Sequence, residues 1–296
     1  MVDALKGAAG PDILTRETYA FPMDYELQDH EFEKISRLVY DVCGIALHEG
    51  KREMVRTRLI KRLRNRNFRS FSDYYRYVTA PEGTEELIAM IDSISTNLTN
   101  FFREDGHFAR LKSVVQSWRA SVRGNGHLPQ LRVWSAGCST GEEPYTIAMV
   151  LLELIPLGHV DLKILATDIS TAVLKKAAEG VYAEDKIKNV PVALRRKYFL
   201  KGVKEWEGFY RVRENLRLPI EFARLNLKEP FSFKEPFDVI FCRNVMIYFD
   251  RKMQQLVVNR FYDCLKEGGW LFIGHSESLT GITHRFKYIE PSVYRK

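Results

Sequence analysis

The sequence predicts an α/β fold in which a doubly wound, mostly parallel sheet follows a small all-helical domain and carries an inserted β-subdomain. From residue 25 to 95, apolar residues recur every three or four positions and no strand pattern interrupts them, which predicts helices alone. From residue 131 onward, short apolar runs alternate with helical segments, the order that produces a parallel sheet with helices on both faces. The last two runs are too close together for a helical crossover, so we expect an antiparallel C-terminal hairpin.

The all-helical domain follows residues 1–24, a stretch of small and polar residues that predicts a loosely ordered tail. Asp29 is a candidate N-cap for the first helix, and Gly44 ends it. A second helix runs from about Lys51 and buries one apolar stripe. The residues expected in this core are Phe32, Ile35, Leu38 and Val39 of the first helix, Val55, Leu59 and Leu63 of the second, and Tyr74, Tyr77, Val78, Leu87, Met90, Ile91 and Ile94 beyond it.

The larger domain, residues 131–296, is predicted to alternate strands and helices. Ser170 and Asp250 are candidate N-caps, Gly180 is a helix stop, and Gly268-Gly269 ends the last helix. The expected strands are 131–136, 162–167, 220–225, 237–242 and 270–273, the helices are 144–154, 171–179 and 251–265, and the C-terminal hairpin pairs 286–289 with 293–295.

A second hairpin is predicted inside the larger domain. Residues 198–202 and 209–212 flank the polar turn 203–208, so we expect a β-subdomain of about residues 196–219 there. Residues 96–130 are predicted to link the two domains and to contribute to a ligand site.

The formal charge of +7 comes from two local clusters. Residues 51–69 hold nine basic residues against one acid, and residues 184–217 hold ten against five, which leaves the remainder slightly acidic. Such clusters predict two electropositive surfaces that meet acidic partners, and they argue against a coat for a nucleic acid. A solvated basic helix is the alternative for the first cluster. Its candidate docking residues are Lys51, Arg58, Lys61 and Arg62, which fall together beside the apolar stripe, and Arg52, which lies off that side.

The composition is that of an ordinary globular chain, with 45% hydrophobic and 28% charged residues. Its four cysteines form no CxxC pair and no histidine lies at zinc-finger spacing, which predicts a reducing compartment and no structural metal. No apolar run approaches the roughly 18 residues that a membrane span needs. We therefore expect a cytoplasmic protein without direct membrane insertion.

The stretch after the first predicted strand, residues 131–145, is the most informative in the chain. It runs from a strand through a glycine loop into a helix, and Gly137 and Gly141 would let the backbone approach a ligand closely. The loop matches neither the dinucleotide-binding nor the phosphate-binding glycine motif, and Glu142 and Glu143 suit a ligand that bears an amine or sulfonium. An ordinary strand-to-helix turn with two exposed acids explains this loop equally well.

Polar residues also follow the other predicted parallel strands. Asp168 ends the second strand, where a carboxylate accepts hydrogen bonds from the ribose hydroxyls of an adenosine ligand; for Asp168 alone, a helix cap is the alternative. Asn226 follows the next strand, and Arg243 and Asn244 follow the one after it. Because the carboxyl ends of parallel strands meet at one edge, these residues and the glycine loop together predict a nucleoside site.

Four segments resemble the CheR-type chemotaxis receptor methyltransferases. They are Ser95-Thr-Asn-Leu-Thr-Asn-Phe-Phe-Arg-Glu104, Trp134-Ser-Ala-Gly-Cys-Ser-Thr-Gly-Glu-Glu-Pro-Tyr145, Phe241-Cys-Arg-Asn-Val-Met-Ile-Tyr-Phe-Asp250 and Gly274-His-Ser-Glu-Ser278. The resemblance runs from about residue 25 to 294 with the domains in the same order. It implies a class I methyltransferase fold and an S-adenosylmethionine-dependent protein-glutamate O-methyltransferase that acts on chemoreceptor cytoplasmic helices and leaves S-adenosylhomocysteine.

The same resemblance implies roles for individual residues. Tyr248 and Arg103 are expected nearest to the transferred methyl group. The helical domain is expected to dock on the helical bundle of the receptor, and the inserted hairpin, with Trp206 and Arg211, resembles the part that in some members grips a receptor C-terminal tail peptide. We expect a monomer that is recruited to membrane-embedded receptor arrays. The cofactor site is expected to contain Asn97, Thr99, Arg103, Gly137, one of Glu142 and Glu143, Asp168, Asn226, Leu227, Arg243 and Asn244.

The chemistry agrees with this implication. A glutamate side chain, with an ordinary pKa of about 4.3, is already an anionic nucleophile at neutral pH, so its methylation requires no general base. The chain accordingly shows no convincing Ser/His/Asp or Cys/His constellation. Arg103 or Tyr248 would orient the incoming carboxylate, although a salt bridge of Arg103 with Glu104 or Asp105 and a core position for Tyr248 stay open as alternatives.

Two other functions compete with this one. A nucleic-acid methyltransferase shares the cofactor fold, but it normally carries an Asn/Asp-Pro-Pro-Tyr motif after the fourth strand, where this chain has Cys-Arg-Asn-Val at residues 242–245. A non-catalytic module that senses S-adenosylmethionine would keep the same binding loops. For His275, the expected role is a hydrogen bond that orders its loop.

Overall fold

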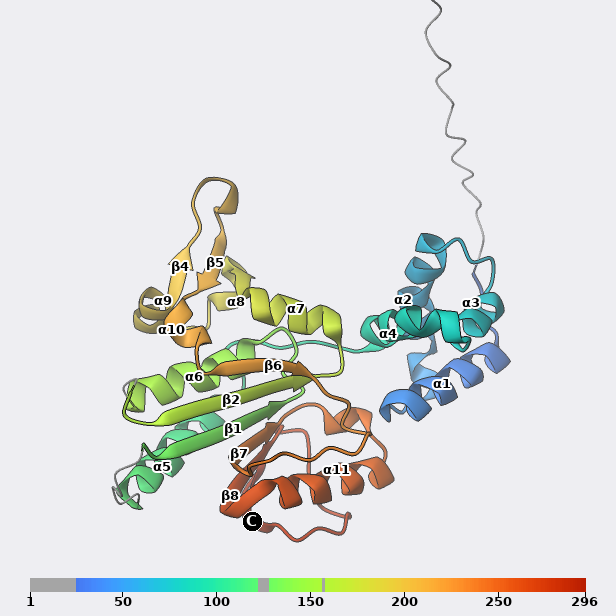
Figure 1. The fold of residues 1–296 in the computed structure, drawn as a ribbon. Helices are drawn as coiled ribbons and strands as arrows, with labels where there is room; N and C mark the ends of the chain where they lie inside the picture. The colour runs from blue at the N-terminus through green and yellow to red at the C-terminus, as the bar shows by residue number, and fades with distance from the viewer. Residues whose placement is uncertain (1–24, 122–127, 156–157) are drawn as a thin grey trace, which may run out of the picture.

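The computed structural model describes residues 25–121, 128–155 and 158–296. Figure 1 shows a helical domain beside a central sheet, with a small β-subdomain as a separate projection. The predicted tail, residues 1–24, and the glycine break at residues 124–126 lie outside the described residues.

The helical domain forms the predicted helices around the predicted apolar stripe. Buried residues of all four helices pack into one cluster, including Ile35, Leu59, Tyr74 and Met90. The candidate cap is corrected, because Asp29 is already the first helical residue and the N–H of the preceding Gln28 donates to the Glu31 carboxylate over 3.1 Å. The elements are α1 (Asp29–Cys43), η1 (Glu49–Lys51), α2 (Arg52–Asn65), α3 (Phe71–Val78), η2 (Pro81–Gly83) and α4 (Thr84–Ile94).

The segment between the two domains contains a helix that the sequence pattern did not predict. This helix, α5 (Gly106–Ser121), buries Phe108, Leu111 and Val115 in the same cluster as Phe241 and Phe272 of the sheet. The preceding residues, 95–105, form no helix or strand. They cross between the domains as irregular chain, so their backbone groups are free to line a site.

The central sheet has seven strands in the order β6-β2-β1-β7-β8-β10-β9, with one antiparallel strand, β10, between β8 and β9. The other neighbouring pairs are parallel. The mostly parallel sheet and its antiparallel C-terminal hairpin are therefore confirmed. The strands are β1 (Gln130–Ala136), β2 (Asp161–Asp168), β6 (Ile220–Arg224), β7 (Phe237–Cys242), β8 (Leu265–Ile273), β9 (Lys287–Glu290) and β10 (Val293–Arg295).

Helices cover both faces of this sheet. Successive side chains of a strand point to opposite faces, so a strand with apolar residues at consecutive positions needs a packing partner on each face. Val239 and Phe241 of β7 pack with α5 and α6 (Glu142–Leu154) on one face, and Ile240 packs with α11 (Arg251–Cys264) on the other. A fourth helix, α7 (Thr171–Glu179), contacts β2 and β6. The connections between these elements leave the sheet at the carboxyl ends of β1, β2, β6 and β7.

Two predicted helix caps are confirmed, and one predicted helix end is wrong. The Ser170 hydroxyl accepts a hydrogen bond from Val173 N–H over 3.3 Å, and the Asp250 carboxylate accepts one from Met253 N–H over 2.8 Å. Gly268-Gly269 does not end a helix, because α11 stops at Cys264 and β8 already begins at Leu265. The glycines lie where the pairing of β7 with β8 shifts register, and Gly268 has a φ of +76°.

The inserted hairpin is confirmed and belongs to a larger subdomain. Strands β4 (Phe199–Lys201) and β5 (Phe209–Val212) pair antiparallel, and β3 (Val181–Ala183) adds a third strand on the other side of β5. A strand of three residues is too short to show a period of two in sequence. The remaining elements are the short helices α8 (Glu184–Ile187), α9 (Val192–Tyr198) and α10 (Glu214–Arg217), and the turn η3 (Lys204–Trp206).

Among the described residues, no helix combines the length and the apolar character that crossing a membrane requires.

Candidate functional site

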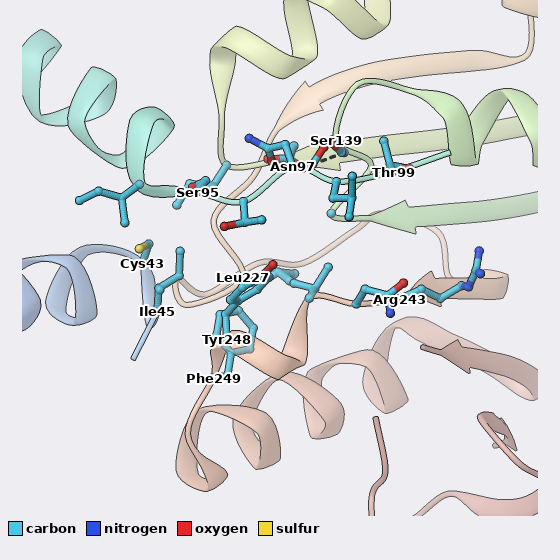
Figure 2. Close-up of a pocket in the computed structure, with 18 of the residues that line it drawn as sticks. Cys43, Ile45, Ser95, Asn97, Thr99, Ser139, Leu227, Arg243, Tyr248 and Phe249 are labelled. Carbon is cyan, nitrogen blue, oxygen red and sulfur yellow. Dashed lines mark hydrogen bonds between the residues drawn. The ribbon is translucent and has the colours of Figure 1, made fainter. Parts of the chain in front are cut away.

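A pocket lies between the helical domain and the carboxyl ends of the parallel strands (Figure 2). It encloses about 1240 Å³ of space, the solvent at its mouth included. Its walls come from the end of α1 and the start of α2, from residues 94–103, and from the loops after β1, β2, β6 and β7. This is the position at which doubly wound sheets bind ligands.

The structure brings nearly all of the predicted site residues together in this pocket. These residues come from segments that are far apart in the sequence, from Asn97 to Tyr248. Glu142 is not among the residues that line it. The predicted residues in the lining are Asn97, Thr99, Arg103, Gly137, Glu143, Asp168, Asn226, Leu227, Arg243, Asn244 and Tyr248, and Lys51 of the predicted docking set lies there too.

The two glycines of the loop after β1 are required by the packing of the protein around them. Gly137 has a φ of +85°, and a Cβ there would lie 2.3 Å from Val245 Cγ2. Gly141 has a φ of +96°, and a Cβ there would lie 2.8 Å from the Tyr182 hydroxyl. Gly141 thus packs against side chains of β3 and α7 and is not among the lining residues, whereas Gly137 lines the pocket, so the approach of its backbone to a ligand stays a prediction.

Asp168 does not cap a helix, because Ser170 is the N-cap of α7; its carboxylate instead holds two loops at the end of β2. Its Oδ2 accepts a hydrogen bond from Ser139 N–H of the glycine loop over 2.8 Å, and its Oδ1 accepts one from Ser170 N–H over 3.0 Å. Burial raises the pKa of this carboxyl, although the backbone hydrogen bonds oppose the shift. Each oxygen retains further acceptor capacity, and the residue lines the pocket.

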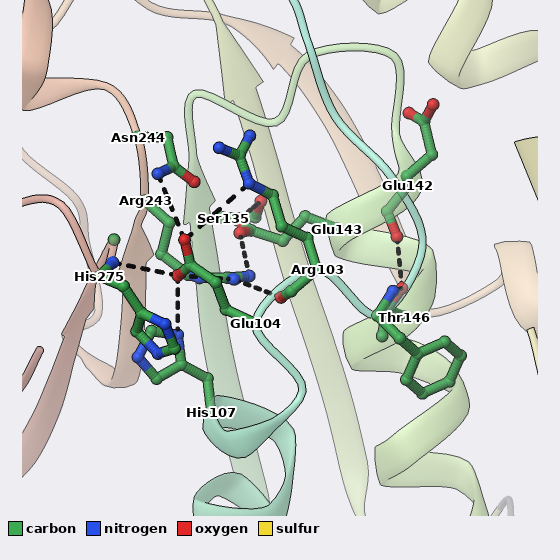
Figure 3. Close-up of polar contacts among 12 residues, drawn as sticks. Arg103, Glu104, His107, Ser135, Glu142, Glu143, Thr146, Arg243, Asn244 and His275 are labelled. Carbon is green, nitrogen blue, oxygen red and sulfur yellow. Dashed lines mark hydrogen bonds and ion pairs between the residues drawn. The ribbon is translucent and has the colours of Figure 1, made fainter. Parts of the chain in front are cut away.

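The structure decides between the two adjacent glutamates. Glu143 lines the pocket, and Glu142 is buried away from it and accepts a hydrogen bond from the Thr140 hydroxyl over 2.6 Å. Figure 3 shows their side chains pointing in different directions from α6. The inclusion of Glu142 among the cofactor-binding residues is therefore corrected: neighbouring positions on a helix differ by about 100° in direction.

A buried ion network supports the floor of the pocket (Figure 3). Arg243, whose side chain is 2% exposed, donates to Glu143 over 3.1 Å and to Glu104 over 3.0 Å, and it also donates to the carbonyl of Arg103. Burial alone would raise the pKa of Glu104, but Arg243 outweighs it and the net pKa lies below its ordinary value. At Glu143 burial prevails and raises the pKa. Arg243 thus joins α6, the interdomain segment and the loop after β7.

Arg103 and Tyr248, the predicted catalytic residues, both line the pocket. The Arg103 guanidinium donates to Leu98 O over 2.8 Å and lies 3.9 Å from the Glu104 carboxylate. The salt bridge with Glu104 that the sequence left open is therefore long, and Arg243 lies closer to the same carboxylate, at 3.0 Å. Tyr248 is partly exposed and outside the core. Its hydroxyl has no hydrogen-bond partner in the described part of the chain.

Two histidines lie against Glu104. His275 N–H donates to its carboxylate over 3.2 Å, which is a hydrogen bond from the backbone of the loop rather than from the ring. His107 is 3% exposed, and burial, with Arg243 nearby, lowers its pKa to about 4, so it is neutral at pH 7. Ligand atoms of Glu104, His107 and His275 lie within 4.8 Å of one another. A metal there would compete with Arg243, which already pairs with Glu104.

Three of the predicted docking residues on α2 have partners inside the helical domain. Arg52 pairs with Asp29 and donates to Leu27 O, Arg58 donates to Ile94 O over 2.6 Å, and Arg62 pairs with the buried carboxylate of Glu86 over 2.6 Å. The remaining two, Lys51 and Lys61, are exposed. Trp206, 56% exposed, and Arg211 are exposed on the β-subdomain.

Sequence reasoning missed the wall that the helical domain contributes. Ile45, Leu47 and Met54 line the pocket from the junction of α1 and α2. They carry no motif, because apolar residues in a short connection look like ordinary core or surface positions. Ser139, also missed, lies in the glycine loop, and its hydroxyl donates to Asn97 O over 3.2 Å.

The lining is suited to a ligand with a positively charged part. Around the Arg243 network, two carboxylates share one buried guanidinium. Asp168 has no cationic partner within the residues that the structure describes. With the apolar walls of Ile45, Leu227 and Val245, the pocket offers a few convergent polar groups in an apolar cavity. A nucleoside that carries a cationic group fits this donor and charge set.

Comparison with known families agrees with this chemistry. The family model described as "CheR methyltransferase, SAM binding domain" matches residues 97–295, and the one described as "CheR methyltransferase, all-alpha domain" matches residues 30–95. The first match covers the sheet and its loops, and the second covers α1 to α4.

Curated relatives are similar over most of their length. The chemotaxis protein methyltransferase of Borreliella burgdorferi is 41% identical over 93% of this chain and 97% of its own. The protein of the same name from Escherichia coli is 42% identical over 90% of this chain and 91% of its own. Among solved structures, N-methyltransferase NodS from Bradyrhizobium japonicum in complex with S-adenosylhomocysteine is 16% identical over 59% of this chain and 62% of its own, with a TM-score of 0.33, which is too distant to bear on the site.

Proposed function

This chain belongs to the CheR methyltransferase family and uses S-adenosylmethionine, and on that premise we propose that it methylates glutamate side chains on the cytoplasmic helices of chemoreceptors. The products are glutamate methyl esters, which serve sensory adaptation, and S-adenosylhomocysteine. The observation that supports this most directly is the position of the pocket. It lies at the junction with the basic helical domain, and its lining holds three side chains that can donate to a carboxylate, Arg103, Tyr248 and Lys51.

The residues of the pocket divide into those that suit the nucleoside and those that suit the charged end of the cofactor. Asp168, with spare acceptor capacity at the edge of β2, suits the ribose hydroxyls. Glu143, next to a guanidinium that it shares with Glu104, suits the ammonium or sulfonium. Asn97, Thr99 and Leu227 supply the walls.

The reaction needs positioning more than proton transfer. S-adenosylmethionine, when bound, supplies a methyl group on a positively charged sulfur. The acceptor glutamate is already ionised at neutral pH, so the protein has to align its oxygen and exclude water. Joining a carboxylate to a sulfonium consumes both charges, so exclusion of water by the bound substrate favours that outcome.

Arg103 and Tyr248 are the proposed catalytic residues. One nitrogen of the Arg103 guanidinium donates to Leu98 O, which leaves its other N–H groups for a substrate carboxylate. The free hydroxyl of Tyr248 offers a second donor from the opposite side of the sheet edge, on η4 (Met246–Tyr248). The Tyr248 hydroxyl is a neutral donor, and the Glu104 carboxylate beside the Arg103 cation limits how strongly that cation reduces the nucleophilicity of the substrate carboxylate.

Docking on the receptor is proposed for two surfaces. Lys51 and Lys61 remain available on the basic side of the helical domain, close to the mouth of the pocket in the case of Lys51, and they suit acidic receptor helices. On the β-subdomain, β4 is a free sheet edge beside Trp206 and Arg211, which suits an extended receptor tail peptide that adds a strand. We further propose a cytoplasmic monomer that is recruited to receptor arrays and binds no nucleic acid.

Incubation with S-adenosylmethionine labelled in its methyl group tests the proposed reaction. With chemoreceptor cytoplasmic fragments we expect label on receptor glutamates that is released by mild base, as methyl esters are. RNA in a parallel reaction should stay unlabelled. Arg103→Ala should reduce transfer by about 100-fold through loss of substrate orientation, whereas Arg76→Ala, at an exposed arginine of α3, should leave it unchanged. Label on RNA would favour a nucleic-acid methyltransferase, and binding of S-adenosylhomocysteine without transfer to any acceptor would favour a sensing module.

Pull-down with receptor C-terminal peptides tests the second docking surface. We expect the Trp206→Ala, Arg211→Ala double variant to retain at least about tenfold less peptide than the wild type, because aromatic and arginine side chains dominate binding energy at interfaces. Lys188→Ala, at an exposed lysine of the same subdomain, provides the control. Equal retention by the double variant and the wild type would reject the tail-binding proposal.

A further inference from the structure

The C-terminal end of α1 receives side-chain donors from the other domain. Lys228 Nζ donates to Tyr40 O over 2.6 Å and to Asp41 O over 2.5 Å, and Asn226 Nδ2 donates to Val42 O over 2.7 Å. Three consecutive carbonyls of the last turn are therefore bound by residues that follow β6. Tyr40 O also accepts the Gly44 N–H over 2.8 Å, but the carbonyls of Asp41 and Val42 have no partner within the helix, so these donors complete its last turn.

Charge makes the lysine contact more than a hydrogen bond. The last turn of α1 contains no basic residue of its own, although the C-terminal end of a helix favours a cation. Lys228 supplies that cation from the other domain, and its ammonium also lies 5.1 Å from the centre of the Tyr40 ring. Lys228 is only partly exposed, so solvent screens these contacts less than those of a surface lysine.

The segment that carries Lys228 is itself held by hydrogen bonds from α11. Arg260 of α11 donates to Leu227 O and Lys228 O, each over 3.0 Å, and to Glu229 O over 2.8 Å. Asn226 Oδ1 accepts a hydrogen bond from Lys228 N–H over 3.1 Å. The donors that bind α1 therefore stand on a rigid turn, and their position is set by the methyltransferase domain.

Beyond the last turn, α1 continues directly into the wall of the pocket. Ala46 N–H donates to Tyr248 O over 2.8 Å, and Ile45 pairs with Phe249 in an isolated antiparallel bridge. Cys43 and Ile45 line the pocket from the helical domain, and Asn226 and Leu227 line it from the loop after β6. The contacts of Asn226 and Lys228 with the last turn of α1 thus join these two parts of the lining.

We propose that Lys228 is a positioning residue that seats α1 against the turn after β6 and so holds the cofactor pocket in its binding shape. It does not line the pocket and acts through the carbonyls of Tyr40 and Asp41. Its loss lets the end of α1 and residues 44–47 move away from Asn226 and Leu227, and a ligand that needs both walls then binds only the seated fraction of molecules. The proposal rests on the family's cofactor occupying this pocket.

Calorimetric titration with S-adenosylhomocysteine tests the inference without a methyl acceptor. For Lys228→Met we expect the Kd to rise about tenfold, because the seated arrangement falls to a minor population. Lys228→Arg should restore most of the affinity, since a guanidinium can donate to the same two carbonyls. Lys175→Met, which removes an exposed lysine from α7, should bind like the wild type.

Hydrogen exchange of residues 44–48 gives an independent readout. In the wild type the Ala46 amide is protected by its bond to Tyr248 O, and S-adenosylhomocysteine should slow its exchange further. In Lys228→Met the exchange should be faster, and about tenfold more S-adenosylhomocysteine should be needed to slow it than in the wild type, while exchange in β1 stays unchanged. A merely structural role would raise exchange throughout the helical domain and leave the Kd of the folded protein unaltered.

Unchanged affinity together with unchanged exchange at residues 44–48 in Lys228→Met would overturn the inference. Failure of the proposed function has a different signature, because a wild type that binds S-adenosylhomocysteine but methylates no receptor would contradict the substrate and leave the role of Lys228 standing.

Discussion

Replacing Arg243 by methionine should lower the free energy of unfolding by about 3 to 5 kcal/mol, the cost of leaving buried charges without their partner. Glu143 and Glu104 would both lose their cation, and the Arg103 carbonyl would lose a donor. Methionine replaces the unbranched apolar stem of arginine and keeps most of its packing, so the loss of stability reports mainly the loss of the charge. Urea unfolding followed by tryptophan fluorescence measures it.

Two further variants make this result interpretable. Arg285→Met removes an arginine that pairs with Asp263 in an exposed position, and its effect should stay below about 1 kcal/mol. Adding Glu143→Gln to Arg243→Met should recover part of the lost stability, because a neutral amide at position 143 no longer needs a counterion. A loss in Arg243→Met no larger than that in Arg285→Met would show that the network does not stabilise the fold.

Replacing Asp168 by alanine should weaken S-adenosylhomocysteine binding by at least about 100-fold, because the loops that shape the pocket lose the carboxylate that holds two of their N–H groups. Ser139 N–H and Ser170 N–H are the groups concerned, and the ligand loses its proposed ribose partner at the same time. Asp168→Asn retains one acceptor oxygen and should fall between alanine and the wild type. Titration calorimetry measures all three.

The pH dependence of this binding has a definite sign. Burial raises the pKa of Asp168 above its ordinary value, so the carboxylate takes up a proton at a higher pH than an exposed aspartate does. Affinity for S-adenosylhomocysteine should therefore be complete above the raised pKa and decline as the pH falls through it, and Asp168→Asn should lack that decline. Asp161→Ala, at the far end of the same strand, is the matched control. Equal affinity of Asp168→Ala and Asp161→Ala would exclude Asp168 from the site.

The carboxyl-edge residues were predictable because a parallel sheet imposes its own geometry. Once residues 131–136, 162–167 and 237–242 are identified as parallel strands, the residues that follow each strand must meet at one edge. Asp168, Arg243 and Asn244 were found in this way, and all line the pocket. Caps such as Ser170 and Asp250 were predictable because they depend on contacts within four residues.

The predictions that were wrong or missing concern residues whose structure depends on contacts with distant parts of the chain. Gly268-Gly269 was expected to end a helix because glycine commonly does so, but the pairing of β8 with β7 extended the strand through it. Tertiary hydrogen bonds thus overrode a local preference. Helix α5 was missed in a segment read as a linker, and its apolar residues are buried only because the sheet lies beneath them.

By itself, the sequence determined the alternation of strands and helices, the polar edge of the sheet and the residues in the family's motifs, because periodicity and spacing act within one element or between adjacent ones. Only the tertiary structure decided which partner each charge has. It turned Glu143 toward the pocket and Glu142 away, buried Arg243 between two carboxylates, engaged Arg58 and Arg62 inside the helical domain, and placed Lys228 on the end of α1. Those contacts join residues up to 188 positions apart, and their energies depend on burial and distance, which no local pattern encodes.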